Sequence, residues 1–110
     1  MKIAVSAQEK GLSAPVDPKF GRAKWLVIYD TETQSVESID NSANLALTQG
    51  AGIKTAELVT KHNCRVVLTG HLGPKALKTL QAAGIEGYNG VAGTVKDAIN
   101  SWKEGKLPKA

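Results

Sequence analysis

An apolar run that ends in a loop bracketed by two glycines constrains this chain more than any other feature. Residues 66–69 are apolar or β-branched without alternation, which is typical of a strand buried on both faces. Gly70 and Gly73 follow, and apolar residues recur at helical spacing after Pro74, a residue suited to a first helical turn. The pattern predicts a buried strand, a tight loop and a helix. Backbone N–H groups at such a junction favour an anion, and His71 lies in the loop.

Length and cysteine content indicate one reduced domain. A chain of 110 residues can bury a core without cross-links, so residues 1–110 are treated as a single domain. Its one cysteine, Cys64, allows no intramolecular disulfide. No apolar run is long enough for a signal-peptide core or a membrane span. We therefore expect a cytoplasmic protein that does not contact a membrane. The net charge of +4 is compatible with an anionic partner but does not identify one.

The remaining periodicities predict five strands and three helices. The strands are expected at residues 2–7, 25–29, 35–40, 66–69 and 85–88. The helices are expected after the glycines of residues 50–52, after Pro74, and from Val95, where Thr94 and Asp97 have the spacing of a capping box. The element order is therefore βββαβαβα. A hairpin followed by strand–helix units predicts an α/β fold with a mixed, mostly parallel five-stranded sheet flanked by three helices.

Two segments lack periodicity. Residues 8–22 form a long irregular loop whose end, residues 19–24, is basic. A loop of this length inside a compact domain is usually functional. Residues 106–110 follow the last predicted helix and are expected to be a frayed tail.

Three glycine-containing loops precede the predicted helices, at residues 50–52, 69–73 and 89–93. Ligands of such sheets bind beyond the carboxyl ends of the strands, so we expect the three loops to meet in one anion site. Lys54, Lys75 and Lys78 lie in or near first helical turns, where a cation is unfavourable unless an anion is close.

The sequence contains no recognisable catalytic apparatus. It has no Walker pattern, dinucleotide GxGxxG, CxxC or GxSxG elbow. A metal-dependent hydrolase would need carboxylates gathered at strand ends, and the first strand offers Ser6 instead. We therefore expect a protein that is not an enzyme. Other residues have simple structural interpretations: Cys64 as a small core residue, His71 as a hydrogen-bonded structural histidine, and the loop glycines as turn residues with positive φ.

Three spaced motifs resemble the dinitrogenase iron–molybdenum cofactor-binding family over nearly the whole chain. They are residues 20–23 (Phe-Gly-Arg-Ala) before an apolar strand, residues 50–53 (Gly-Ala-Gly-Ile) at a helix start, and Gly70-x-x-Gly73 before another helix. The resemblance implies a ribonuclease H-like fold and non-catalytic binding, carriage or assembly of a metal–sulfur cluster. One small family member holds a molybdenum–copper sulfide cluster of the thiomolybdate type, and this is the cofactor that the resemblance implies. Cluster-assembly or acceptor proteins would then be partners.

Combining the basic loop, the glycine loops and the resemblance gives one candidate cofactor site. Cations would supply charge, backbone N–H groups would donate hydrogen bonds, His71 would be a donor or weak ligand, and Leu72 would offer apolar contact. No direct ligation of a metal by other side chains is expected. The predicted residues are Lys19, Arg22, Lys24, Gly50, Ala51, Gly52, Lys54, Thr69, Gly70, His71, Leu72 and Gly73.

The alternative is an RNA- or nucleotide-binding module that uses the same basic edge. It ranks lower, and we expect no nucleic-acid partner, because single-strand binding needs exposed aromatic side chains and most aromatic residues here fall in core patterns.

Overall fold

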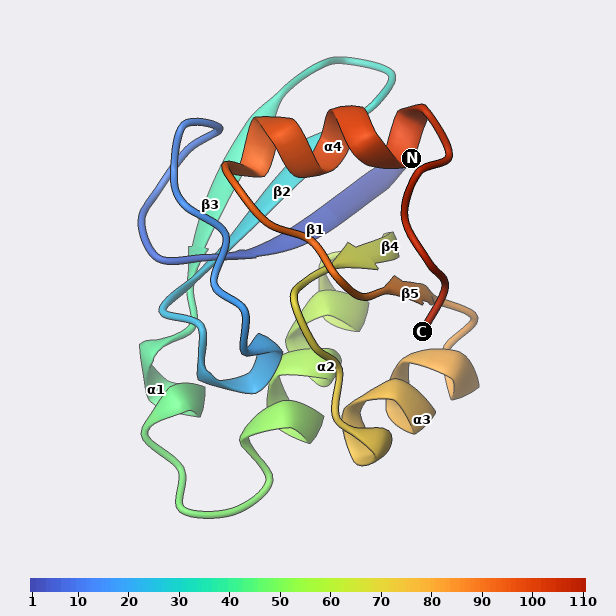
Figure 1. Ribbon diagram of the computed structural model, residues 1–110. Helices are drawn as coiled ribbons and strands as arrows, with labels where there is room; N and C mark the ends of the chain where they lie inside the picture. The colour runs from blue at the N-terminus through green and yellow to red at the C-terminus, as the bar shows by residue number, and fades with distance from the viewer.

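The computed structural model describes residues 1–110 and contains one five-stranded sheet with helices on both faces (Figure 1). All five predicted strands are present, with ends that differ from the prediction by no more than two residues. The strands are β1 (Lys2–Ala7), β2 (Trp25–Asp30), β3 (Val36–Asp40), β4 (Cys64–Leu68) and β5 (Glu86–Tyr88). Their order across the sheet is β3-β2-β1-β4-β5.

Strand β2 runs against the other four. It pairs antiparallel with β1 and with β3, whereas β1 pairs parallel with β4 and β4 with β5. The prediction of a mostly parallel sheet is therefore correct for strand direction but wrong for the pairings, of which half are antiparallel. The reason is that one reversed strand between two others creates two antiparallel ladders.

The helices include one that the sequence pattern did not predict. The three predicted helices are α2 (Ala51–Lys61), α3 (Pro74–Ala82) and α4 (Val95–Lys103), and a short helix α1 (Ser42–Leu45) precedes them. The predicted helix count and the order βββαβαβα are thus wrong by one element. Helix α1 has four residues, none of them buried, so it is too short and too exposed to show a helical period. None of the helices combines the length and hydrophobicity needed to cross a membrane.

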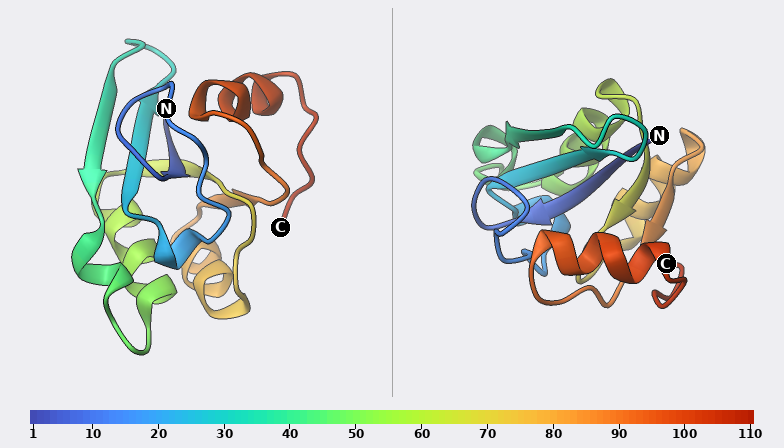
Figure 2. Two further views of the ribbon diagram at one scale, coloured as in Figure 1. Left: turned by 60° about the vertical axis from the view of Figure 1, so that its left-hand side comes forward. Right: turned by 90° about the horizontal axis from the view of Figure 1, so that it is seen from above.

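Each face of the sheet is covered by its own helical layer. Helices α2 and α3 pack on one face and α4 packs on the other (Figure 2). Alternate residues of β1 enter the two layers, since Ile3 and Val5 join the α4 side while Ala4 joins the α2 and α3 side. Burial on both faces explains why the central strands are apolar without alternation.

The segment of residues 8–22 is irregular apart from a 3₁₀ turn, η1 (Phe20–Arg22). It is tied to the sheet and to the loop before α4, because Asp17 N–H donates to Ser6 O (2.8 Å) and Val16 N–H donates to Gly93 O (2.9 Å). These bonds fix the path that leads the chain to η1.

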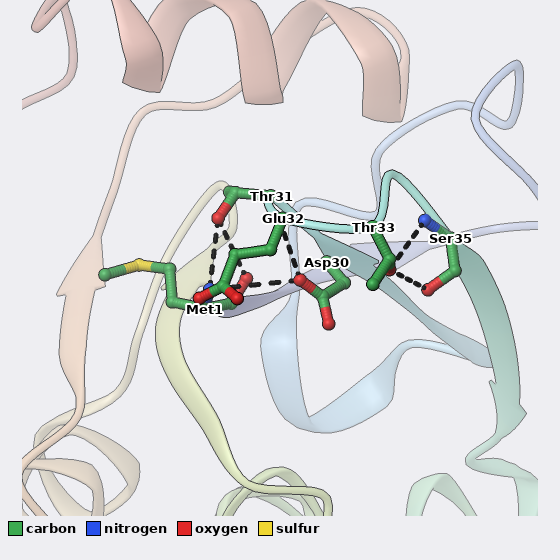
Figure 3. Close-up of polar contacts among 6 residues, drawn as sticks. All are labelled: Met1, Asp30, Thr31, Glu32, Thr33 and Ser35. Carbon is green, nitrogen blue, oxygen red and sulfur yellow. Dashed lines mark hydrogen bonds and ion pairs between the residues drawn. The ribbon is translucent and has the colours of Figure 1, made fainter.

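The β2–β3 turn contacts the first residue of the chain (Figure 3). The Met1 amine donates to Thr31 Oγ1 at 3.1 Å and lies 3.4 Å from Glu32 Oε1. A hydrogen bond from Glu32 N–H also holds the pKa of Asp30 below its ordinary value. These contacts are exposed, so each contributes little to stability.

The prediction of a frayed tail at residues 106–110 is wrong. Asn89 N–H donates to Pro108 O (3.2 Å), and Ala110 N–H donates to Gly87 O (2.8 Å). An ion pair joins Lys109 to Glu86. The tail therefore lies along the outer edge of β5, whose backbone groups would otherwise be unpaired.

Candidate functional site

A cavity of about 500 Å³ opens where η1, α2 and α3 come together. Helices α2 and α3 lie side by side and begin at the same end of the molecule, with η1 close to the start of α2 (Figure 1). The cavity is lined by η1, by the segment leading into α2, by the loop before α3, and by the first turns of both helices. We call this cavity the pocket.

The two helices that open into the pocket have uncapped N-termini. The N-cap residues are Gly50 for α2 and Gly73 for α3; neither helix has a side-chain cap or an acidic residue in its first turn. The amides of Ala51, Gly52 and Ile53 have no acceptor within the chain, as expected of a first turn. By contrast, α4 begins away from the pocket and has the predicted capping box. The pocket therefore presents free N–H donors and the positive ends of two helix dipoles.

The charges around the pocket are of one sign. Lys19, Arg22 and Lys75 line it together with His71, and no aspartate or glutamate does. The Arg22 guanidinium also donates two hydrogen bonds of 2.6 Å through Nη1, to Leu45 O and Leu47 O. Arg22 thus holds the end of α1 and the start of the segment that follows it, while it contributes charge to the pocket. A concave site with cations and N–H donors but no carboxylate favours an anion.

The floor of the pocket is apolar and tightly assembled. Phe20, Ala51 and Ala76 are buried beneath it. A Cβ atom at Gly21 would lie 2.7 Å from both Cα and N of Gly52, so η1 and α2 touch through their backbones. Glycine is needed at position 21 because only a residue without a side chain permits this approach.

The loop glycines do not share one role. Gly50 has a φ of +77°, so the interpretation as a turn residue with positive φ holds for it. Gly70 has no positive φ, but a Cβ there would lie 2.6 Å from Pro18 Cα. Gly73 has a φ of −66° and open space around it. Gly52 has no positive φ either, so positive φ is a wrong explanation for Gly52, Gly70 and Gly73.

The structure brings seven of the twelve predicted site residues together at the pocket. They come from the three motifs and from the basic end of the long loop. These residues are Lys19, Arg22, Gly50, Ala51, Gly52, His71 and Gly73.

Two predicted lysines do not line the pocket. Lys54 lies one turn further along α2 and pairs with Glu57 at 3.3 Å on the helix surface. Lys24 lies next to β2, close enough to Asp40 to help lower the pKa of that carboxyl, although hydrogen bonds from Ser42 are the larger cause. Each of these two lysines therefore interacts with a nearby carboxylate outside the pocket.

Three predicted residues of the second loop point into the core or the backbone behind it. Thr69 is fully buried, and its Oγ1 lies 2.6 Å from Ser6 Oγ, so a hydroxyl pair joins β1 to the residue directly after β4. Leu72 is buried in the cluster beneath α3, and Gly70 packs on Pro18. Only the alternate residues His71 and Gly73 face the pocket.

The third glycine loop, residues 89–93, does not line the pocket, so the expectation that three loops share one site is wrong. It lies behind the second loop and bonds to it: Val91 N–H donates to Thr69 O (3.2 Å), and Leu72 N–H donates to Asn89 Oδ1 (2.9 Å). Because β5 follows β4 directly in the sheet, its loop supports the neighbouring loop.

Sequence reasoning missed several lining residues. Lys75 was recognised as a first-turn cation that favours a nearby anion but was not placed in the predicted site, whereas the polar residues before α2 gave no signal because that segment has no periodicity. The missed residues are Phe20, Gly21, Thr48, Gln49, Ile53, Pro74, Lys75 and Ala76.

No group of three or more His, Cys, Asp or Glu side chains is arranged to hold a metal ion. Cys64 lies at the start of β4, outside the pocket, and is 3% exposed. Burial raises the pKa of its thiol to about 11, so the thiolate that would bind a metal is disfavoured. The pocket therefore offers cations and N–H donors as its means of binding.

Comparisons with known proteins agree with these features. Residues 1–105 match the family described as dinitrogenase iron-molybdenum cofactor. The apo form of the orange protein from Desulfovibrio gigas is 43% identical, with a TM-score of 0.96 over 99% of this chain and 92% of that chain. A Thermotoga protein described as a candidate NifB protein is 33% identical, with a TM-score of 0.86 over 98% of this chain and 91% of that chain. An uncharacterised protein of Methanocaldococcus jannaschii is 30% identical over 99% of this chain and 91% of its own length. The predicted family is confirmed: this chain belongs to the dinitrogenase iron–molybdenum cofactor family.

Proposed function

We propose that this protein binds a molybdenum–copper sulfide cluster non-covalently at the pocket, for carriage or assembly, and does not catalyse a reaction. The observation that carries the proposal is the composition of the pocket: two uncapped helix N-termini and three cations, with no carboxylate. The cluster is cargo, so the protein must hold and release it.

The charge of such a cluster suits the pocket. A unit of molybdenum(VI) with four sulfides is a dianion, and two units bridged by copper(I) form a trianion. Lys19, Arg22 and Lys75 supply three positive charges at the pocket. Because sulfide already ligates the metals, N–H donors and cations are sufficient to hold the cluster. A direct thiolate ligand is not required.

The apolar part of the lining suits sulfide better than a hard oxyanion. Ile53 and Pro74 line the pocket and neither is buried, and large polarisable sulfur atoms make favourable contacts with apolar groups. A compact oxyanion such as phosphate would lose more hydration for the same contacts. The pocket thus combines charge for the whole cluster with apolar surface for its sulfides.

The test is retention of a reconstituted cluster by two lysine variants. Purified protein is incubated anaerobically with tetrathiomolybdate and a copper salt, desalted, and examined by ultraviolet–visible spectroscopy and elemental analysis. Lys75→Gln should weaken retention about fivefold, the effect of roughly 1 kcal/mol for one partly solvated charge, and the loss should diminish at high salt. Lys24→Gln removes a charge outside the pocket and should retain the cluster as well as the original protein.

Two results would refute the proposal. One is a protein that stays colourless and free of both metals after reconstitution. The other is an equal loss of cluster in Lys24→Gln and Lys75→Gln, which would mean that overall charge and not the pocket governs binding.

The alternative as an RNA- or nucleotide-binding module gains no support from the pocket. The one aromatic residue that lines it, Phe20, is 2% exposed and offers no face on which a base could stack. The hydrolase alternative is equally unsupported, because β1 and β4 lead to Ser6 and Thr69 in place of paired carboxylates.

The same proposal places the protein in the reduced cytoplasm, with cluster-assembly or acceptor proteins as its partners. It also assigns the sheet to the ribonuclease H-like class, supported by the order β3-β2-β1-β4-β5 and by the single reversed strand.

A further inference from the structure

The loop of residues 70–73 contributes His71 and Gly73 to the pocket but is held from behind. Leu72 N–H donates to Asn89 Oδ1 at 2.9 Å, and Gly90 N–H donates to Gly70 O at 2.9 Å. The side chain of one residue, Asn89, thus fixes the amide that lies between the two pocket-lining residues. Asn89 itself does not line the pocket.

Leu72 is anchored at its side chain as well. It is buried, and it packs so closely on the backbone of β5 that a Cβ atom at Gly87 would overlap Leu72 Cδ1. Strand β5 therefore holds the Leu72 side chain, and Asn89 holds the Leu72 amide. Any shift of this end of β5 would move the loop that carries His71.

Asn89 is in turn bonded to the tail. Its N–H donates to Pro108 O, and Ala110 N–H donates to Gly87 O two residues earlier. The tail runs from α4 back to the edge of the sheet beside β5 (Figure 1). The tail, residues 106–110, lies beyond the part of the chain that matches the family, residues 1–105. A continuous set of backbone and side-chain bonds thus links the tail to the pocket.

We propose that Asn89 is a positioning residue for the pocket, and that residues 106–110 act as a strap that holds Asn89 and β5 in place. This inference rests on the proposed function, since the pocket is the cluster site. It assigns a role in cluster retention to a loop and a tail that do not touch the cluster.

The test measures the loop directly and cluster retention separately. Amide hydrogen exchange by NMR reports the Leu72 N–H, and release of preloaded molybdenum and copper reports the pocket. Asn89→Ala should speed Leu72 exchange about fivefold or more, as expected for loss of one hydrogen bond, and should speed cluster release. Asn89→Asp keeps an oxygen acceptor and should restore slow exchange. Asn100→Ala makes the same change on the exposed side of α4 and should alter neither measurement.

The strap is tested in the full chain by Ala110→Pro, which removes the N–H that donates to Gly87 O. Exchange of the Asn89 and Leu72 amides should become faster, while the amides of β1 remain as slow as in the original protein. Unchanged Leu72 exchange in Asn89→Ala would overturn the positioning role. Equal acceleration throughout β1 would overturn it too, because the effect would then be general destabilisation.

The proposed function and the positioning role of Asn89 can be refuted independently. If the original protein retains no cluster but Leu72 exchange responds as expected, the proposed function fails and the strap stands as a property of the loop. If the cluster is retained equally by the original protein and Asn89→Ala, the function stands and the positioning role is refuted.

Discussion

Replacing Gly21 by alanine should push η1 and α2 apart. The added Cβ would lie 2.7 Å from Cα and N of Gly52 and 3.1 Å from the carbonyl carbon of Ala51. All three atoms belong to the backbone of the first turn of α2, so no side chain can rotate away. Gly21 has no positive φ, so the cost arises from this contact and not from backbone strain.

The size of the effect follows from overpacking. Forcing one extra methyl group into a tightly packed contact costs about 1–3 kcal/mol. A middle value of about 2 kcal/mol corresponds to a Tm about 8 °C lower for a domain of this length. The same displacement widens the pocket between η1 and α2, so cluster retention should fall as well.

Gly73→Ala is the matched control for stability. It also adds one methyl group to a pocket glycine, but Gly73 has a φ of −66° and no atom near the added Cβ. Its free energy of unfolding should change by less than about 1 kcal/mol, because the restriction that alanine places on the unfolded chain and the poorer N-cap that alanine makes for α3 act in opposite directions.

The assay is urea denaturation of the three proteins without ligand, followed by circular dichroism. A Gly21→Ala protein within about 0.5 kcal/mol of the original would refute the packing argument, since surface changes alone have effects of that size. So would a Gly73→Ala protein that loses as much stability as Gly21→Ala.

Two further predictions concern titrating groups. Burial raises the pKa of the Cys64 thiol from 9.0 to about 11, so iodoacetamide at about pH 8 should label unfolded chains but spare native ones. Rapid labelling of the native protein would contradict this. For the same reason the free energy of unfolding should decrease as the pH rises above 9. The hydrogen bond from Thr94 N–H holds the pKa of Asp97 below its ordinary 3.8. The ionised Asp97 carboxylate therefore stabilises the folded protein above pH 3.8, and this stabilisation is lost as the pH falls through the folded-state pKa. Asp97→Asn should therefore flatten the fall of Tm as the pH is lowered through and below 3.8. A Tm that falls equally steeply in both proteins would contradict this.

The fold could be predicted where local pattern and tertiary environment agree. Leu26, Val27 and Ile28 are consecutive and all buried, because the sheet is covered on both faces, and burial on both faces appears in the sequence as an apolar run. The Thr94 and Asp97 capping box marked the start of α4 for a similarly local reason. Helix α1 has no such mark.

The structure of the tail and the roles of the glycines were harder to predict, because both depend on contacts with residues that are distant in the sequence. Nothing in the sequence of residues 106–110 indicates a strand, and the tail is ordered by the free edge of β5. The need for glycine at position 21 depends on Gly52, which a whole strand hairpin separates from it. The three motifs do contribute residues to the pocket lining, while Lys24 and Leu72 were included among the site residues by sequence neighbourhood alone.

The uncapped starts of α2 and α3 have a thermodynamic consequence. An anion that accepts hydrogen bonds from these first turns completes the two helices, as Thr94 and Asp97 complete α4. Such an anion binds only the folded chain, because the two helix ends converge only there. Occupancy would then raise the free energy of unfolding by about 2.7 kcal/mol at a ligand concentration one hundred times Kd. Empty and loaded chains would consequently differ in lifetime wherever unfolded protein is degraded.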